Sequence, residues 1–226
     1  MNRKRENWLV VLVVFLVFGQ TTMADEAEDA FNSLYGEEMK RVVATPSLAD
    51  DIILANKLLE AAHSVSNQPS LFAVLCEKTY GLAGKSPTGC ATALAAMELL
   101  AEKIPEKKIE CFQKSADLLQ SEYGKSRGET KTKIGQILIQ ALKNIASAQV
   151  AAGNLDGALA TLKQALSIAS SVSPSSGQVL QAQLVAIAKR QAAEKQVAAL
   201  KAKLTDNPGD TALRKGWVQG IRVCNG

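Results

Sequence analysis

The sequence predicts an all-α fold, on three observations. Alanine and leucine supply 34 and 27 of the 226 residues, and both side chains lose little rotamer freedom in a helix. Apolar residues recur at alternating steps of three and four, the spacing of one helical face. No stretch alternates between polar and apolar residues for long enough to propose a strand. An all-β fold is therefore disfavoured, and a hydrophobic content of 47% disfavours a disordered chain.

The first 24 residues predict a secretory signal peptide. Three basic residues precede the uninterrupted apolar run Leu9–Phe18, and a short segment of small and polar residues ends at Ala24. Ten or eleven apolar residues span about 16 Å as a helix, against roughly 30 Å for a membrane core, so an uncleaved anchor is the weaker alternative. We expect cleavage after Ala24, no membrane insertion afterwards, and export to the periplasm, the cell envelope or the medium.

Prolines and glycines divide the rest of the chain into expected helices. Proline breaks a helix interior but suits a first turn, and every proline falls between amphipathic stretches. In the proline-free interval from Pro105 to Pro174, the joints fall at Gly124, Gly128 and Gly153. The expected helices are, in order, 26–44, 48–64, 70–84, 89–103, 106–122, 129–152, 155–171, 178–205 and 209–218.

Start signals and apolar stripes justify these segments. Ser47 with Asp50 three residues later marks the start of the second helix, and Ser86 directly precedes Pro87 before the fourth. Steps of three and four define the fifth helix through Ile109, Phe112, Ala116, Leu119 and Tyr123, and the seventh through Leu155, Leu159, Leu162, Leu166 and Ala169. The eighth is about 28 residues long. It is either packed on 155–171 or serves as a coiled-coil or partner-docking helix.

Residues 142–166 resemble a tetratricopeptide repeat. Seven residues occupy its packing and turn positions: Leu142, Ile145, Ala146, Gly153, Ala158, Leu162 and Ala165. The match departs from the repeat at Gln149, where an aromatic residue is usual, and its closing proline comes late, at Pro174. The resemblance implies antiparallel helical hairpins stacked as a tetratricopeptide-like α-solenoid. An irregular helical bundle stays open as the alternative, because other Ala/Leu-rich hairpins share this spacing.

A second resemblance covers roughly residues 25–215. The segments 34–38, 44–46, 49–51, 58–62, 75–78 and 96–102 look like parts of exported, uncharacterised helical-repeat proteins of planctomycete-type bacteria. This resemblance implies an envelope location and no known activity.

The expected organisation is a signal peptide (1–24), a helical-repeat domain (25–205) and an irregular tail (206–226). After Asn207 a new helix opens, but its periodicity is lost from Gly216 onward. Solenoids need a polar capping repeat, and this ending supplies none. The sequence therefore predicts a truncated or frame-shifted chain with an uncovered apolar face.

The cysteines give little indication of a disulfide framework or a metal site. The four cysteines, Cys76, Cys90, Cys111 and Cys224, are too sparse for a disulfide framework and too widely spaced for a zinc site. Burial as small apolar residues is the first interpretation for Cys76 and Cys111. Cys76 with Cys90 is the one disulfide to test, because the two flank an expected helix joint.

No catalytic, metal or cofactor site is predicted. His63 lies at a helix end without a nucleophile or acid identifiable around it, and Lys85 reads as a solvated joint residue rather than part of a phosphate-binding loop. Asp50 and Asp51 are adjacent in sequence, so on a helix their side chains point about 100° apart. Both are expected in first-turn or exposed positions.

Charge and architecture together give the expected function. After Ala24 the chain carries 23 Lys and Arg against 21 Asp and Glu, which argues against nucleic acid or an anionic membrane as the partner. Repeat stacks expose extended surfaces that suit peptides or helices. We expect a non-catalytic, exported protein that presents such a surface to a protein partner. A structural spacer, the N-terminal part of a larger envelope or surface protein, is the alternative.

Overall fold

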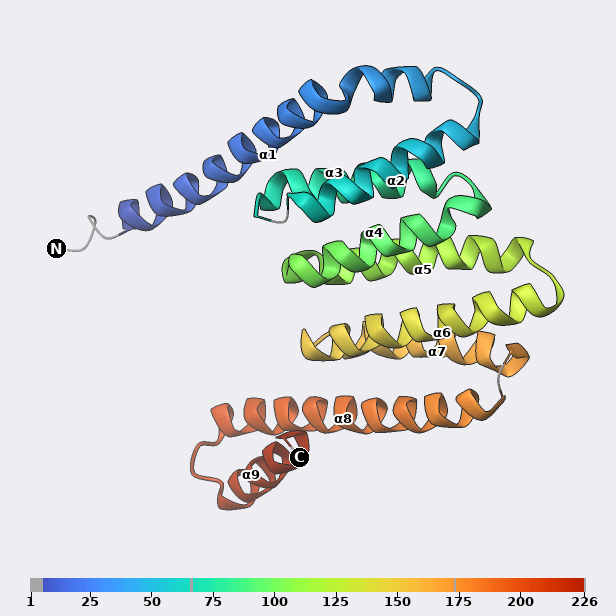
Figure 1. The fold of residues 1–226 in the computed structure, drawn as a ribbon. Helices are drawn as coiled ribbons and strands as arrows, with labels where there is room; N and C mark the ends of the chain where they lie inside the picture. Colours follow the sequence, from blue (N-terminus) through green and yellow to red (C-terminus); the bar gives the residue numbers. More distant parts are fainter. Residues whose placement is uncertain (1–5, 66, 173, 226) are drawn as a thin grey trace. The chain divides into compact units, whose positions relative to one another are not determined.

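The computed structural model describes the backbone of residues 6–65, 67–172 and 174–225, and the side chains of residues 25–65, 67–172 and 175–221. Within these ranges the chain forms helices joined by short turns, and no strand (Figure 1). The predicted all-α fold is confirmed. The basic residues Arg3, Lys4 and Arg5 of the expected signal peptide lie outside the described residues.

The helices follow the expected segments closely. They are α1 (Glu6–Val43), α2 (Leu48–Ser64), α3 (Pro69–Ala83), α4 (Cys90–Lys103), α5 (Lys108–Lys125), α6 (Gly128–Ala151), α7 (Leu155–Val172), α8 (Pro174–Asp206) and α9 (Thr211–Asn225). Two 3-10 turns, η1 (Pro87–Gly89) and η2 (Pro105–Lys107), precede α4 and α5. Helix α1 continues through the expected cleavage point at Ala24. No helix of the described part of the chain is long and apolar enough to cross a membrane.

The expected irregular tail over 206–226 is wrong, because α9 continues to Asn225. The expectation rested on a loss of helical periodicity from Gly216 onward, a segment in which Gly216 and Gly220 also weaken an isolated helix. In the structure they face α8, where a Cβ on Gly216 would lie 3.7 Å from Leu200 and one on Gly220 only 2.6 Å from Val197. The two glycines therefore permit close helix contact, and tertiary packing outweighs their low helix propensity.

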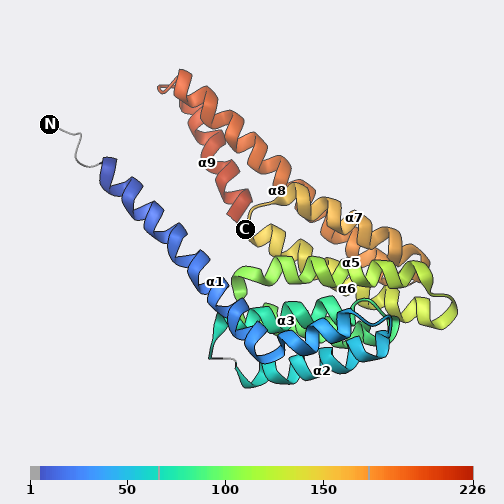
Figure 2. The ribbon, with the colours of Figure 1, turned by 90° about the horizontal axis from the view of Figure 1, so that it is seen from above.

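The chain divides into two compact units, residues 1–118 and 119–226, where a single helical domain over 25–205 was expected. In the first unit, α2 packs against α3, α3 against α4, and α1 against both α2 and α3. Figure 2 shows α1, α2 and α3 side by side. Phe31, Leu54, Phe72 and Met97, from four different helices, are all fully buried in its core.

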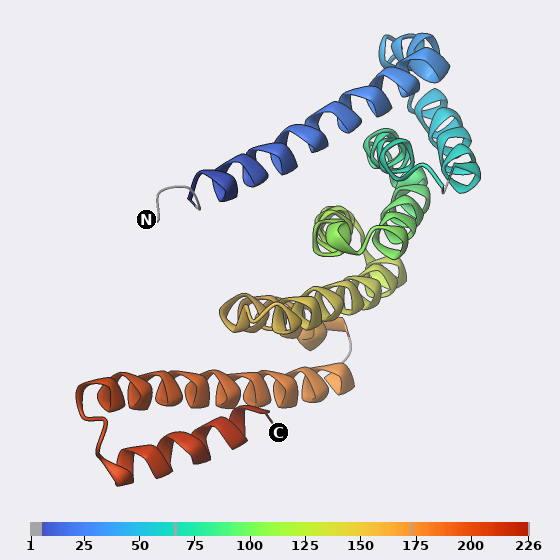
Figure 3. The same cartoon turned by 90° about the vertical axis from the view of Figure 1, so that its left-hand side faces the viewer.

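In the second unit each helix packs on the next, from α6 through α7 and α8 to α9. Figure 3 shows α8 and α9 as an antiparallel pair. The core holds Leu138 from α6, Leu162 from α7 and Leu180 from α8, each at most 2% exposed. Whether these hairpins belong to a tetratricopeptide-like solenoid or to an irregular helical bundle stays a prediction.

Candidate binding groove

A tight turn joins α6 to α7 and sets up the candidate site. Gly153 adopts a φ of +76°, a left-handed conformation that glycine reaches without Cβ strain. The backbone N–H of Asn154 donates to the carbonyl of Gln149 at 2.8 Å, and the side-chain oxygen of Asn154 accepts from the N–H of Gly157 at 2.9 Å. This turn closes the end of α6 and caps the start of α7, so the two helices run antiparallel.

The seven residues that resemble repeat positions lie at this hairpin. Six are buried, with at most 4% of each residue exposed: Leu142, Ile145, Ala146, Ala158, Leu162 and Ala165. The seventh, Gly153, forms the turn. At Gln149, where the resemblance departs, the side-chain oxygen accepts a hydrogen bond from the Thr161 hydroxyl at 2.9 Å. A polar bridge between α6 and α7 therefore occupies the position expected for an aromatic residue.

Two hollows lie between α6 and α8. The first, of about 160 Å³, is lined by Gln136, Ile139, Gln140, Lys143, Ser176, Val179 and Leu180. The second, of about 290 Å³, is lined by Lys143, Ala146, Ser147, Val150, Leu162, Gln183, Ala186 and Ile187. Because Lys143 borders both, the two hollows lie next to each other, and together they are named the groove between α6 and α8, with Leu162 of α7 contributing to its lining.

The lining combines three kinds of chemistry. Apolar side chains such as Ile139 and Ile187 offer contacts to apolar groups, while the glutamine amides carry both donors and acceptors. Lys143 is the one charged residue of either lining. Its ammonium donates to the Gln140 side-chain oxygen at 3.4 Å, and among the described side chains no carboxylate pairs with it. The groove thus offers one cation to an incoming group.

The cysteines near α3 are placed in the core of the first unit. Cys76 and Cys111 are buried, and Cys90 is half-buried at the start of α4. Burial, with smaller contributions from Cys111 and Glu77, raises the pKa of the Cys76 thiol to about 12. Cys76 is therefore a protonated, unreactive thiol at neutral pH. The structure contains no disulfide bond between Cys76 and Cys90. The formation of that disulfide stays a prediction.

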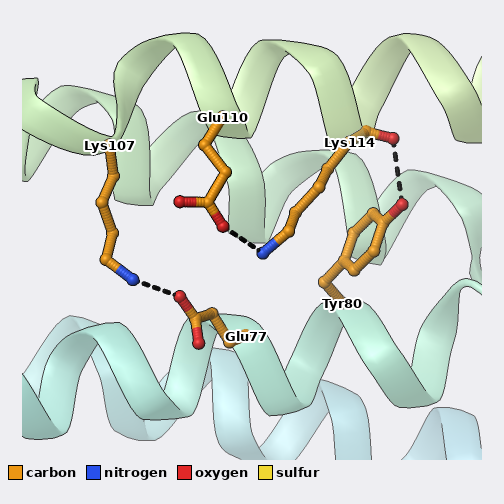
Figure 4. Close-up of polar contacts among 5 residues, drawn as sticks. All are labelled: Glu77, Tyr80, Lys107, Glu110 and Lys114. Carbon is orange, nitrogen blue, oxygen red and sulfur yellow. Dashed lines mark hydrogen bonds and ion pairs between the residues drawn. The ribbon is translucent and has the colours of Figure 1, made fainter. Parts of the chain in front are cut away.

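A polar cluster connects α3 to the start of α5 (Figure 4). Lys107 forms an ion pair with Glu77, Lys114 pairs with Glu110 at 2.7 Å, and the Tyr80 hydroxyl donates to the carbonyl of Lys114 at 2.9 Å. Burial alone would lower the pKa of Lys114, but the hydrogen bond to Glu110 and the charges of Glu77 and Glu110 outweigh it and raise the pKa. The same hydrogen bond lowers the pKa of Glu110. The cluster thus joins α3 to η2 through one ion pair and to α5 through one hydrogen bond, while the Lys114–Glu110 pair lies within α5.

The remaining polar residues singled out from the sequence lie apart from the groove. Asp51 lies in the first turn of α2, one of the two expected placements, but it is buried, and Lys85 pairs with it at 2.9 Å. Lys85 is exposed at the α3–α4 joint, as expected, and in addition it pairs with a carboxylate of α2. The pairing of Lys85 with Asp51 depends on the approach of the α3–α4 joint to α2, and no local sequence pattern predicts that approach. His63 is exposed in the last turn of α2, and the described residues contain no group of three metal-ligating side chains.

The chain was compared with known protein families, curated proteins and solved structures, and none of them matches it. The resemblances to tetratricopeptide repeats and to exported planctomycete-type proteins therefore stay predictions, which rest on the residues given above.

Proposed function

We propose that this protein is a non-catalytic, exported binding protein that holds an extended segment of a partner protein in the groove between α6 and α8. The observation that carries the proposal is the pair of adjoining hollows that share Lys143 in their lining. It is bounded by two helices that are separated in sequence by α7, as expected where hairpins pack in succession.

The chemistry of the lining supports an extended peptide as the occupant. An extended backbone presents N–H and C=O groups along its length, and the amides of Gln136, Gln140 and Gln183 are able to pair with both. Apolar lining residues accommodate alternate side chains of such a strand. Lys143 favours an acidic side chain or a terminal carboxylate at the centre of the groove, since charge complementarity fixes register and speeds encounter.

Selection from a random peptide library displayed on phage, followed by titration of the enriched peptides, tests the proposal. We expect enriched sequences to carry an acidic residue or a free carboxyl end. Ala186→Trp, which fills the groove, should abolish binding, and Lys143→Gln should weaken it by about tenfold, the loss of one charge-assisted hydrogen bond.

Matched controls separate groove effects from general damage. Ala160→Trp and Lys163→Gln make the same changes at exposed positions of α7 outside both linings, and we expect them to leave binding unchanged. A library that yields no enriched peptide, or binding that survives Ala186→Trp, would refute the proposal and leave the structural-spacer alternative.

The export part of the proposal has its own test. The described core residues of α1, Ala27, Phe31 and Val42, all follow Ala24, so cleavage there retains them. N-terminal sequencing of the protein recovered from the envelope or medium should read from Asp25. Recovery from the cytoplasm with residues 1–24 intact would contradict export.

A further inference from the structure

Charge is divided unequally between the two units. Residues 25–118 carry 9 Lys and Arg against 15 Asp and Glu, whereas residues 119–226 carry 14 against 6. The near-neutral total therefore conceals an acidic first unit and a basic second unit. Opposite net charges on two units of one chain attract between copies, with a range set by the Debye length.

The basic excess is concentrated at α8 and α9. Residues 174–225 carry 8 basic residues against 3 acidic ones. Among the described side chains, no residue after Leu184 is buried. Trp217 and Ile221, the large apolar residues spaced four apart on α9, are only half-buried. In the described part of the chain, the α8–α9 hairpin is thus not covered by another helix where it extends beyond α7. Apolar side chains of the hairpin are therefore exposed to solvent.

The outer face of α9 combines apolar and basic groups. Val218 is 41% exposed, and one turn before it Arg214 and Lys215 are exposed as well. Residues three and four apart share a helical face, so these three side chains form one patch. Neither cation forms an ion pair with a described carboxylate. The patch offers one apolar contact flanked by two positive charges.

A complementary surface lies on the first unit, between α1 and the start of α3. A hollow of about 540 Å³ is lined by Glu26, Ala27, Ala30, Gln68, Pro69, Ser70 and Leu71. Asp25, Glu26 and Asp29 are exposed on the same stretch of α1, and no described cation pairs with them. The hollow therefore presents an apolar floor beside three unneutralised carboxylates. All of these residues follow Ala24, so the surface is retained if the signal peptide is removed.

We propose that α9 of one copy docks on this α1–α3 hollow of a second copy, so that the protein self-associates head to tail. Val218 enters the hollow, and Arg214 and Lys215 pair with Asp25, Glu26 and Asp29. Because the two surfaces differ, the contact is heterologous, and each copy keeps one of each surface for further association. The groove between α6 and α8 does not take part, so this inference is independent of the proposed function.

A second copy fits the observations better than a polyanion. A membrane or nucleic acid would attract the second unit but repel the first, which carries six more acidic than basic residues over 25–118. Insertion of α9 into a membrane would also require its apolar face to leave α8. Docking between copies uses only surfaces that are already exposed. One helix face is a small contact area, so the association is expected to be weak.

Sedimentation velocity of the protein with its native N-terminus, over about 1–500 μM, tests the proposal. In about 0.1 M salt the average mass should rise with concentration. In about 1 M salt, where the Debye length falls to about 3 Å, it should return to that of a monomer. Asp25→Lys/Glu26→Lys/Asp29→Lys and, separately, Arg214→Glu/Lys215→Glu should each weaken self-association at least tenfold, since each makes the facing surfaces repel.

The two variants together give the decisive readout. In a mixture, the reversed acidic surface of one variant faces the reversed basic surface of the other, so association should be restored; it should also be restored when both sets are combined in one chain. The control sets Glu60→Lys/Glu98→Lys/Glu106→Lys and Lys163→Glu/Lys189→Glu match these charge changes at other exposed positions. Because the controls also change the net charge of each unit, we expect a small loss in both, well below the loss in the matching surface variants.

Several results would overturn the proposal. These are a monomer at all concentrations, failure of the mixture to associate, equal loss in the control sets, and a salt-dependent compaction that is independent of concentration. The last result would mean that the two surfaces meet within one chain. Binding of the monomeric protein to anionic phospholipid vesicles or to an oligonucleotide, without self-association, would assign the basic face to a polyanion instead.

Discussion

Substitution of the two α9 glycines by alanine should have opposite effects on the α8–α9 hairpin. Alanine favours a helix interior over glycine by about 0.8–1.0 kcal/mol. At Gly216 the added Cβ would lie 3.7 Å from Leu200, an ordinary contact, so Gly216→Ala should stabilise α9 by nearly that amount. At Gly220 the added Cβ would lie 2.6 Å from the Val197 Cγ2 atom. Overpacking of this kind costs about 1–3 kcal/mol, which exceeds the gain.

Hydrogen exchange of the α9 amides measures both effects, because it reports the free energy of local opening. In about 1 M salt, where electrostatic association between copies is screened, exchange of the two variants should differ by about tenfold or more. Val197→Ala removes the contacted methyl group, so Val197→Ala/Gly220→Ala should recover the stabilisation expected of alanine. The coupling energy of this double-mutant cycle should exceed about 1 kcal/mol. Equal exchange in the two glycine variants, or no coupling to Val197, would refute the packing of α9 on α8.

Three further predictions concern the rest of the chain. Gly153→Ala should lower the free energy of unfolding by about 1 kcal/mol in urea titration, because φ is +76° while nothing lies within 4 Å of the added Cβ. Gly153→Asn should cost less, since asparagine tolerates that conformation. Burial raises the pKa of Cys76 to about 12 from an ordinary value near 9, so the folded state holds this proton more tightly and stability should fall between about pH 9 and 12. Cys76→Ala should reduce that slope by up to about 1.4 kcal/mol per pH unit, and an unchanged slope in parallel unfolding curves would contradict the assignment. Lys85→Met leaves the buried Asp51 carboxylate without its cation and should cost about 1–3 kcal/mol by thermal unfolding. Asp51→Asn in the same chain should recover part of the loss, and equal stability of parent and Lys85→Met would contradict this role.

Local sequence signals were sufficient to predict the presence of nearly every helix. Steps of three and four residues, prolines in first turns and a glycine turn at 153 act within one or two helical turns, so they are readable without knowledge of distant contacts. Two helices extend furthest beyond their predicted bounds: α1 begins at Glu6 rather than at residue 26, and α9 continues beyond residue 218. Gly216 and Gly220 lower the helix propensity of α9, but Leu213, Trp217 and Ile221 keep a four-residue spacing on one helical face, and packing on α8 accommodates both glycines, so the helix continues to Asn225.

The candidate site was accessible to sequence reasoning only in part. The packing residues of 142–166 were identified, because they alternate with the helix period. The groove was missed, because it requires α6 and α8 to flank α7, and nothing in sequence spacing places Lys143 near Val179 or Ile187. The burial of Asp51 in the first turn of α2 was not predicted for the same reason, since its partner Lys85 lies 34 residues away.

By itself, the sequence determined the all-α class, the positions of the helices and the identity of most apolar stripes, because helix formation and amphipathicity depend on near neighbours. Only the tertiary structure decided where the chain divides into units, and that boundary changed the meaning of the charge. Summed over the whole chain the charges nearly cancel, whereas on either side of residue 118 they separate into an acidic unit and a basic unit. Electrostatic attraction depends on where charges lie in space. The net charge of the whole sequence therefore does not reveal the opposite charges of the two units, which become visible only once the fold defines their boundary.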